Sequence, residues 1–593
     1  MADKKKTSLH IVFLLALLAF ASSFHFVSFD NEKTRFDLSF SLALHGETNI
    51  DSYHKNTIDK AFYKGHYYCD KAPGLSFAAV PFILLGKFLS PNLSWSPDNP
   101  IARYILIFIV ISVPSALSVY ALSHIADALS PGKNNLPLLF CYLGSIVFPF
   151  STMFYDHQFS SVLFLFSVFL FFKRFYNNDR SFIPLSFFGA FLASYSSISE
   201  YPMFIPSSAL LLMWIFKEKK LFYRFILITG FCFPLILFMY YNKISFGSPF
   251  SIGYFFESHP WFHNEMNKGI GGVTHPNIAV LFNLLFSPHR GLFWAQPFLL
   301  LAIPGVFLSL RTKNNYKLFL IFASLFIAYR LLVNSSYYEP YGGFTPGPRF
   351  LTPTIPFITI FAILFFSTMK SYLKMFFAGF GVFSLIYFTT VNFVEPNVPY
   401  IFASPLLQYT IPLLSKGYSP ISPHVFDALK IFTIFLLLIF SFHSVLNLEK
   451  NIFKRSHFFV AGLILISSLF FLTLHIIPTK KSVASYYLGT AFSQNRQYVQ
   501  AIKEFDDSIK AAPDAHFSWY QMGLSYFRLS KYDDAISCFR KSHLLAPDNA
   551  QYLKTYFALL VDQEKCADAS DLYERYSSKL KFLENSFLDK CQK

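Results

Sequence analysis

Apolar runs near twenty residues long recur along this 593-residue chain and constrain its fold more than any other feature. An α-helix needs about twenty residues to cross roughly 30 Å of hydrocarbon, so each run predicts a transmembrane helix. Only 14% of the residues are charged, against roughly a quarter in an ordinary soluble domain. The sequence therefore predicts an all-α, polytopic membrane protein. The runs lie near 8–29, 74–89, 101–127, 136–153, 158–172, 182–199, 203–216, 221–241, 291–310, 318–336, 350–369, 373–390, 426–446 and 457–477.

The distribution of Lys and Arg predicts how these runs alternate across the membrane, because cytoplasmic loops carry an excess of both residues. The same bias accounts for the formal charge of +16, so we expect no nucleic-acid partner. With the basic connections taken as cytoplasmic, the alternation is consistent from 101 to 477. When the spans are counted from the basic N-terminus, which is also taken as cytoplasmic, the alternation holds only if 74–89 does not cross the membrane. The basic connections are residues 4–6, 173–180, 217–220, 311–317, 370–374 and 450–455.

Without 74–89, about thirteen transmembrane helices remain in a membrane domain of residues 1–477. We interpret 8–29 as a retained first span rather than a cleaved signal peptide. The run 74–89 begins with Pro-Gly and contains a Pro and a Lys, so we expect an interfacial helix within a first external loop of residues 30–100. The other predicted external regions are 242–290, which is also long, 337–349 and 391–425.

The tail, residues 478–593, is polar and repeats itself with an offset of 34 residues. Its small residues would let paired helices approach closely and its aromatic residues would fill the seam, which is the tetratricopeptide pattern. A third, degenerate copy from about 550 is expected to cap this α-solenoid. The alternation of the spans places the tail outside the cytoplasm, and the repeats favour a protein partner. The matching positions are Leu488, Gly489, Phe492, Ala501, Phe505 and Pro513 with Met522, Gly523, Tyr526, Ala535, Phe539 and Pro547.

Asp30 and Glu32 follow the first predicted span directly, and Arg35 comes soon after them. A carboxylate held just above the membrane could take a proton from an acceptor hydroxyl, so Asp30 and Glu32 are candidate catalytic residues. Arg35 is a candidate for lining the same cavity. The alternative is a solvated loop start, with its charges at the level of the lipid head groups.

Two basic residues could hold a lipid phosphate. Lys71, next to Asp70 and a Pro-Gly turn, would act as a compact cationic donor, although an interfacial Lys often simply extends its head group to water. Arg349, in an aromatic and glycine-rich loop with Glu339, could clamp phosphate through two N–H groups. The alternative for that loop is a cap anchored among interfacial aromatic residues. Asp70 and Glu339 are further candidates for lining the cavity.

Three polar residues at the external ends of predicted spans could line the same cavity, and they are Asp156, His157 and Glu200. Arg330 lies within a predicted span and should face the protein interior, because a charge in hydrocarbon is costly.

The sequence predicts no metal site. His259 and His263 are four residues apart with Glu257 nearby, but Pro260 disrupts the helical face that two ligands would share. The six cysteines are scattered and form neither a disulfide framework nor a CxxC motif.

The arrangement resembles the GT-C membrane glycosyltransferases, in particular the lipid A aminoarabinose transferases and the protein O-mannosyltransferases. In that group a carboxylate follows the first span and a lysine-proline motif precedes an interfacial helix. The likeness covers about residues 8–370, and 371–477 only as a pattern of spans. It rests on blocks such as "DNEKTRFDLSFSL", "HYYCDKAPGLSFAAVPF", "SEYP", "LLFSPHRGLFWAQP" and "GGFTPGPRFLTPTIPF".

The resemblance implies transfer of a sugar from a polyprenyl-phosphate donor to an acceptor on the external face of a bacterial inner membrane. Asp30 would be the catalytic base with Glu32 as the neighbouring acid, Lys71 would hold the donor phosphate, and Arg349 would be a weaker candidate for that task. Family members often have two adjacent carboxylates, whereas Asn31 separates them here, so which one acts stays open. The usual Pro-Pro after the lysine is Ala-Pro. A divalent cation also stays open, because some branches use one.

Two other classes of function fit the sequence. A membrane-anchored scaffold would display the repeats for partner binding without catalysis. A ligase or polymerase of lipid-linked glycans, or a transporter, is the remaining alternative, although transporters tend to show inverted internal repeats that are not found here.

Overall fold

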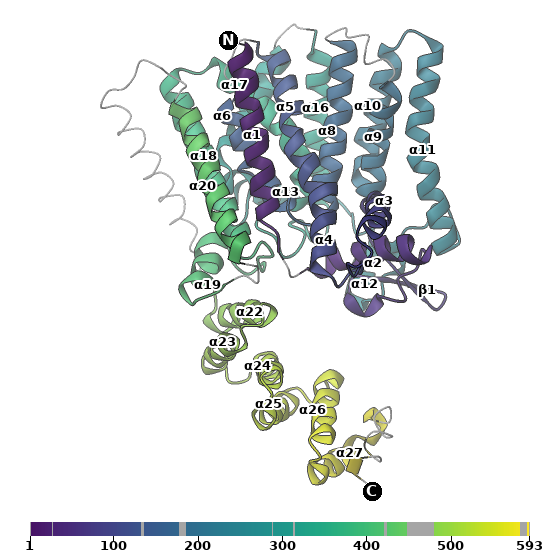
Figure 1. Ribbon diagram of the computed structural model, residues 1–593, viewed down its shortest axis with the longest axis vertical. Helices are drawn as coiled ribbons and strands as arrows, with labels where there is room; N and C mark the ends of the chain where they lie inside the picture. The colour runs from purple at the N-terminus through teal and green to yellow at the C-terminus, as the bar shows by residue number, and fades with distance from the viewer. Residues whose placement is uncertain are drawn as a thin grey trace. The chain divides into compact units, whose positions relative to one another are not determined.

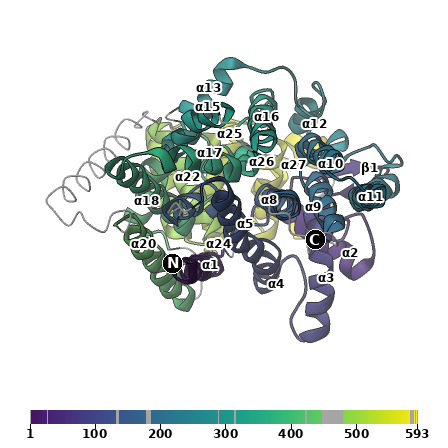
Figure 2. The ribbon, with the colours of Figure 1, turned by 90° about the horizontal axis from the view of Figure 1, so that it is seen from above.

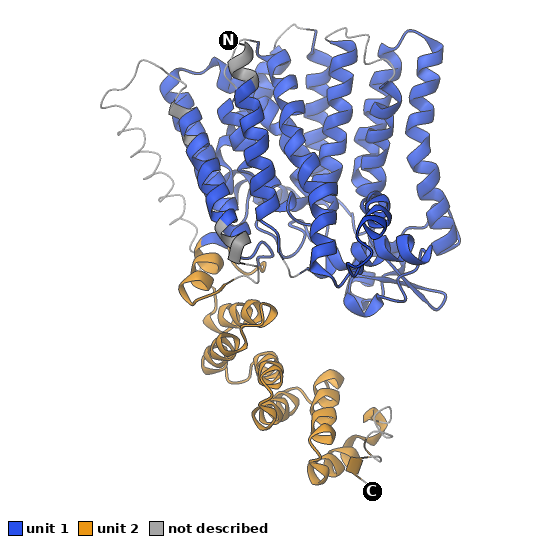
Figure 3. Cartoon of the chain, in the orientation of Figure 1, with its two compact units in different colours: residues 1–398, 404–406, 421–475 blue, residues 399–403, 407–420, 476–593 orange. Residues whose placement is uncertain are grey.

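The computed structural model describes residues 2–25, 28–131, 136–176, 185–287, 289–311, 315–419, 424–446, 479–580, 587 and 590–591. The chain forms two compact units (Figure 3). The first contains residues 1–398, 404–406 and 421–475, and the second contains residues 399–403, 407–420 and 476–593. Both units are helical.

Long helices run side by side in the first unit (Figure 1). Short connections join several neighbours, so consecutive helices alternate in direction. The helices α1 and α20 are tied together by a hydrogen bond of 2.8 Å between the Ser22 and Thr433 hydroxyls. The long helices are α1 (Ala2–Ser22), α4 (Pro100–Ile107) continuing through the π-turn η2 (Phe108–Ser112) into α5 (Val113–Leu129), α8 (Asp156–Phe175), α9 (Ser186–Ser199), α10 (Phe204–Lys217), α11 (Leu221–Phe246), α16 (Lys317–Ser335), α17 (Ile355–Thr368), α18 (Ser371–Val394) and α20 (His424–Leu446).

Within the described residues, six helices are long and apolar enough to cross a membrane. They are Pro100–Leu129, Asp156–Phe175, Leu221–Phe246, Lys317–Ser335, Arg349–Thr368 and Ser371–Val394. Shorter apolar helices include Thr7–Ser22, Tyr201–Lys217 and Pro297–Arg311. The predicted count of thirteen spans is therefore not reached by length and composition, and the last predicted run, 457–477, lies outside the described residues.

Two runs that the sequence analysis treats as single spans are broken. The run 136–153 divides into α6 (Leu136–Leu143) and α7 (Val147–Phe150), and 291–310 divides into α14 (Leu292–Ala295), the 3₁₀ turn η6 (Pro297–Leu301) and α15 (Ala302–Arg311). Gly144 ends α6 where a Cβ would lie 2.8 Å from the Leu385 backbone. Pro297 lacks the N–H that would continue α14. An apolar run of this length therefore does not reveal whether the helix is continuous or broken.

The shorter helices and the hairpin gather at the end of the bundle opposite the start of α1 (Figure 1). The helix α3 lies across the direction of the long helices, as it is seen end-on in Figure 1 and lengthwise in Figure 2. Only glycine fits where α3 begins, because a Cβ on Gly74 would lie 2.8 Å from the Ser199 backbone nitrogen. These segments are α2 (Asp30–His45), η1 (His54–Asn56), β1 (Ala61–Tyr63), β2 (His66–Tyr68), α3 (Gly74–Leu89), η4 (Tyr201–Met203), η5 (Gly253–Phe256), α12 (Pro260–Met266), α13 (Ile278–Phe286) and η7 (Arg349–Thr354).

The hairpin β1–β2 is a small exception to the predicted all-α fold. Its strands are antiparallel, with Ala61 opposite Tyr68. Lys64 and Gly65 both have positive φ, 49° and 90°, as a two-residue hairpin turn requires. The strands are only three residues long, so the alternating pattern that predicts strands has no room to appear.

The second unit consists of paired helices, with aromatic rings packed where glycine leaves room. A Cβ on Gly489 or Gly523 would lie 2.7 Å from Phe505 or Phe539 respectively. This bears out the predicted repeat. The elements are η8 (Pro405–Thr410), α19 (Ile411–Ser415), α22 (Lys481–Gln494), α23 (Tyr498–Ala511), α24 (His516–Arg528), α25 (Tyr532–Leu545), α26 (Ala550–Asp562) and α27 (Cys566–Leu580).

A disulfide closes the end of the second unit. Cys566 at the start of α27 is bonded to Cys591, 25 residues later in the sequence. An isolated pair at this spacing matches no cysteine motif, so the sequence does not predict this bond.

Candidate functional site

Three of the predicted external regions are joined by backbone pairing. Glu257 in the second region forms an isolated bridge with Ala61 of the hairpin, and Ser258 N–H donates to the Lys60 carbonyl at 2.9 Å. Thr274 N–H donates to the Ser336 carbonyl at 2.9 Å, next to the third region. These pairings bring segments separated by about 200 residues of sequence to one end of the helices.

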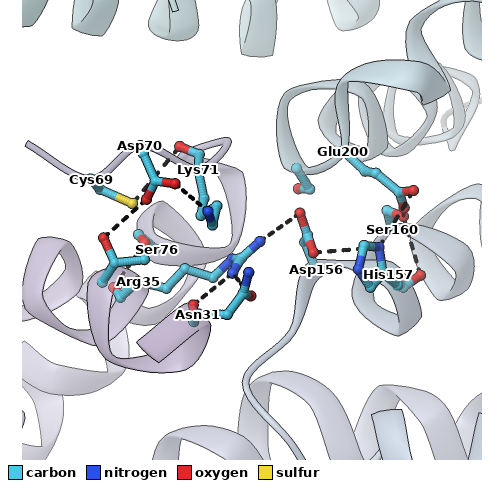
Figure 4. Close-up of polar contacts among 12 residues, drawn as sticks. Asn31, Arg35, Cys69, Asp70, Lys71, Ser76, Asp156, His157, Ser160 and Glu200 are labelled. Atoms are coloured by element: carbon cyan, nitrogen blue, oxygen red, sulfur yellow. Dashed lines mark hydrogen bonds and ion pairs between the residues drawn. The ribbon is translucent and has the colours of Figure 1, made fainter. Parts of the chain in front are cut away.

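Lys71 lies at the centre of a carboxylate cluster, which comprises Asp59, Asp70 and Glu257. Its Nζ forms an ion pair with Asp70 (Figure 4). It also lies 3.4 Å from Asp59 Oδ2 and 4.0 Å from Glu257 Oε1. The ring of Tyr254 packs beside it, with 5.7 Å from Nζ to the ring centroid. The Lys71 side chain is only 11% exposed.

The charges in this cluster depend on burial and on one another. Burial acts to lower the pKa of Lys71, but Asp59, Asp70 and Glu257 raise it well above the usual lysine range. Burial, reinforced by Asp70, raises the pKa of Glu257 to about 11, so its carboxyl is protonated at neutral pH. Burial also favours the neutral form of Asp70, but Lys71 and a hydrogen bond with Glu257 hold the pKa of Asp70 below its usual value. Lys71 is therefore paired with ionised Asp70.

Asp30 and Glu32, the two predicted catalytic carboxylates, have different surroundings. Asp30 begins α2 with its side chain 43% exposed, 3.4 Å from Lys33 Nζ. Glu32 is buried, and its two oxygens accept the backbone N–H groups of Phe29 at 3.2 Å and Phe154 at 2.7 Å. Burial raises the pKa of Glu32. Glu32 ties α2 to the segment before α8, whereas Asp30 is open to solvent.

A buried chain of charges connects α2 with three other segments. Arg35 forms an ion pair of 2.8 Å with Asp156 Oδ2, and Asp156 lies 3.5 Å from His157 Nδ1. His157 Nδ1 also lies 3.5 Å from Glu200 Oε1 (Figure 4). Arg330 forms an ion pair with the same Glu200 oxygen. The structure therefore brings together the predicted cavity residues Arg35, Asp156, His157 and Glu200. Arg330 faces the protein interior, as the sequence predicts.

Arg349 stacks on aromatic rings. Its guanidinium carbon lies 5.2 Å from the Tyr155 ring centroid and 5.3 Å from that of Phe350. Its Nε is buried without a hydrogen-bond partner. In the part of the chain that the structure describes, no carboxylate lies within ion-pair distance of Arg349, in contrast to Lys71, Arg35 and Arg330.

Glu339 belongs to the same loop as Arg349. Burial raises the pKa of Glu339, and Arg349 partly opposes the shift. Asp59 acts to raise the pKa of this carboxyl further, and Lys71 acts to lower it. A Cβ on Gly342 would meet the Arg349 side chain, so this glycine allows the arginine to fold back on its own loop.

Sequence reasoning missed two members of the carboxylate cluster. Asp59 belongs to a turn without a motif, in which its N–H is held by the Thr57 hydroxyl at 3.0 Å. Glu257 was considered only as a neighbour of His259 and His263. Its pairing with Ala61 depends on a contact across about 200 residues, for which the sequence carries no signal. Among the described residues, no group of three or more His, Cys, Asp and Glu side chains is arranged to hold a metal ion.

Comparison with known proteins identifies one part of the chain. Residues 516–549, which form α24 and α25, match the tetratricopeptide repeat family. No curated protein matches the sequence. The chain therefore contains a tetratricopeptide repeat, a module that points to a protein partner.

Proposed function

We propose that this protein is a glycosyltransferase that moves a sugar from a polyprenyl-phosphate donor to an acceptor on the extracytoplasmic face of the membrane. The convergence of Lys71, Arg349 and Arg35 with several carboxylates carries the proposal. This convergence occurs at one end of helices that are apolar enough to cross a membrane. A donor dissolved in lipid would present its phosphate at this level. The sequence blocks that resemble GT-C enzymes support the same class of reaction.

In the proposed reaction, the acceptor hydroxyl attacks the anomeric carbon of the donor sugar. A carbon–oxygen bond to the acceptor forms while the bond from that carbon to the phosphate oxygen breaks. The lipid phosphate leaves with the bonding electron pair, and a fixed cation stabilises the charge that develops on it. Asp30, the more exposed of the two predicted carboxylates, takes the proton of the acceptor hydroxyl.

The charges around each cation favour Arg349 over Lys71 as the first contact of the donor phosphate. Carboxylates already surround Lys71, whereas Arg349 has stacking partners but no ion pair within the described residues. A planar guanidinium can also bind two phosphate oxygens at once. Lys71 then contributes positive charge beside the leaving group.

Cells lacking the protein provide the test. Mass spectrometry of their lipid-linked oligosaccharides and surface glycans should reveal an accumulated donor and a missing product. Wild-type protein should restore the product, whereas Asp30→Asn and Lys71→Ala should not, at equal amounts of membrane-inserted protein. Unchanged glycans in the deletion strain would contradict the function. Full restoration by both variants would contradict the residue assignments.

A matched pair of Arg→Lys substitutions tests the role of Arg349. Arg349→Lys keeps the charge but loses the planar fork and its stacking, so we expect the product to fall about tenfold or more. Arg224→Lys is the control, because Arg224 in α11 contacts the Glu218 carbonyl instead, at 2.8 Å. Equal activity of the two variants would remove Arg349 from the donor site.

The tetratricopeptide repeats would recruit the acceptor or another envelope protein to the enzyme. The match at residues 516–549 also favours a second candidate function, a membrane-anchored scaffold without catalysis. Deletion of residues 480–593 distinguishes the two. A scaffold loses its whole phenotype on this deletion and tolerates Asp30→Asn. A glycosyltransferase retains transfer to a soluble acceptor analogue.

A transporter is distinguished by a different result. It would alter the location of a glycan without forming a new glycosidic bond.

A further inference from the structure

An aromatic groove of about 390 Å³ opens beside the carboxylate cluster. Its volume falls in the range of roughly 300–1,000 Å³ that is typical of small-molecule sites. The hairpin contributes Phe62 and Tyr67 to its lining, and the segment around η5 and α12 contributes the other residues. The lining residues are Phe62, Tyr67, Phe255, Phe256, Glu257, Ser258 and His263.

Several rings of the groove are presented to solvent in fixed positions. Phe62 is 47% exposed and Phe255 is 39% exposed, so both rings are accessible to a ligand. Tyr67 lies 5.0 Å from Phe62, and its other neighbour, His54, stacks on it at 4.3 Å with an interplanar angle of 5°. The groove therefore offers preformed apolar faces.

Two polar groups of the groove each carry a buried atom that has no hydrogen-bond partner. Glu257 has a side chain only 1% exposed, and its Oε2 has no hydrogen-bond partner. Burial and Asp70 raise the pKa of Glu257 to about 11, so the carboxyl can both donate and accept a hydrogen bond. His263 Nδ1 is likewise buried without a partner. The lining itself includes no Lys or Arg, and Lys60 lies outside it with its Nζ 5.0 Å from the centroid of the Tyr67 ring.

We propose that this groove binds a neutral sugar ring of the acceptor. A pyranose has apolar faces that pack on aromatic rings and hydroxyl groups that pair with Glu257 and His263, which a purely apolar ligand would leave unsatisfied. Neither Lys71 nor Arg349 lines the groove, so the phosphate-linked donor belongs at those cations and the other reactant belongs here. Glu257 is shared by both places, which puts the acceptor next to the carboxylate cluster. This inference rests on the proposed transferase function.

Binding without turnover tests the groove. Full-length protein in lipid nanodiscs, with no donor present, is titrated with the methyl glycosides of mannose, glucose and N-acetylglucosamine by saturation-transfer NMR. We expect at least one glycoside to bind, and Phe62→Ala and Phe255→Ala each to weaken it about tenfold. Phe250→Ala is the matched control, because Phe250 is 77% exposed and lies outside the groove. Absence of binding by all three glycosides, or equal binding by every variant, would overturn the inference.

Two further measurements separate this inference from the proposed function. If a polyprenyl-phosphate sugar displaces the glycoside, the groove holds the donor and the assignment to the acceptor is overturned. In the transfer assay, Phe62→Ala and Phe255→Ala should raise KM for the acceptor about tenfold with little change in kcat. Ring-dependent glycoside binding in a protein without transferase activity would contradict the function alone. Transferase activity with an unchanged acceptor KM in both variants would contradict the groove alone.

Discussion

Glu257 and Asp70, two carboxyl groups beside Lys71, differ in protonation state. Both are buried carboxyl groups close to the same ammonium group, but burial keeps Glu257 protonated while Lys71 keeps Asp70 ionised. The cluster therefore holds one strong ion pair and one neutral hydrogen-bonding group. An ion pair that loses one partner leaves an uncompensated charge in a poorly solvated place.

This difference predicts that two similar substitutions affect stability differently: one should leave it unchanged and the other should lower it. Glu257→Gln replaces a neutral group by another neutral group of the same shape, so we expect thermal stability in detergent within about 1 °C of the wild type. Asp70→Asn removes the ionised partner of Lys71 and should cost about 3 kcal/mol or more. Differential scanning fluorimetry at pH 7 measures both. Equal losses of stability would mean that Glu257 is ionised.

Asp37 in α2 makes stability depend on pH. Burial raises the pKa of Asp37 from the usual 3.8 to about 8, despite a hydrogen bond of 3.2 Å from Asn56. The folded state therefore binds a proton that the unfolded state releases above about pH 4. It follows that the contribution of Asp37 to stability falls as the pH rises from about 4 to 8 and is constant above that range.

Asp37→Asn should remove this dependence, because an amide resembles the protonated carboxyl. We expect the variant to unfold about 3 °C or more above the wild type at pH 8.5 and close to it at pH 4.5. Thermal unfolding across this pH range provides the measurement. A constant difference between the two proteins at every pH would show that the Asp37 carboxyl does not titrate in this window.

At the scale of elements, buried charges join α2 and α16 to the consecutive helices α8 and α9. The chain from Arg35 through Asp156, His157 and Glu200 to Arg330 connects α2, α8, the end of α9 and α16. Each charge would be costly alone among apolar helices, so the network fixes how these elements meet. Two of these helices also contact the neighbouring sites, since the Thr34 hydroxyl in α2 donates to Asp70 Oδ1 at 3.4 Å and Arg330 in α16 donates to the Phe350 carbonyl.

A double substitution tests the coupling between α2 and α8. Arg35→Met leaves Asp156 buried without its closest partner and should lower stability by about 3–5 kcal/mol. Adding Asp156→Asn removes the unpaired charge, so the double variant should unfold at a higher temperature than Arg35→Met alone. The exposed pair Arg575 and Asp571 in α27 is the control, and the same changes there should have little effect. Additive losses at Arg35 and Asp156 would contradict the coupling.

At the scale of the whole molecule, the cysteines report on the compartment of the second unit. Cys566 and Cys591 are bonded, whereas Cys69, Cys141, Cys232 and Cys538 are free. Disulfides persist in extracellular and periplasmic proteins and are rare in a reducing cytosol. The bond therefore agrees with an extracytoplasmic solenoid, the location expected from the alternation of basic connections.

Counting thiols tests that location. Protein denatured without reductant should take up four maleimide groups, one on each free cysteine, and six after reduction. Cys566→Ser releases Cys591 and should give five labels without reductant. Six labels on the unreduced wild type, extracted under conditions that block thiol exchange, would place the second unit in a reducing compartment.

The sequence by itself determined the class of fold and the repeats. Apolar runs and 34-residue periodicity are local patterns, because each helix buries its own backbone polar groups and each repeat packs on the next one. The same reasoning singled out Asp30, Lys71 and Arg349, which stand beside turns and span ends.

Only the tertiary structure decided which of the site residues are buried, which are paired and which carry a charge. The burial of Glu32 against Phe154, the place of Glu257 beside Lys71 and the breaks in two apolar runs all depend on contacts between distant segments. The charge state of a carboxyl follows from such contacts, since burial and neighbouring charges set its pKa. Neither the burial of a carboxyl nor the charges around it can be read from the residues next to it along the chain.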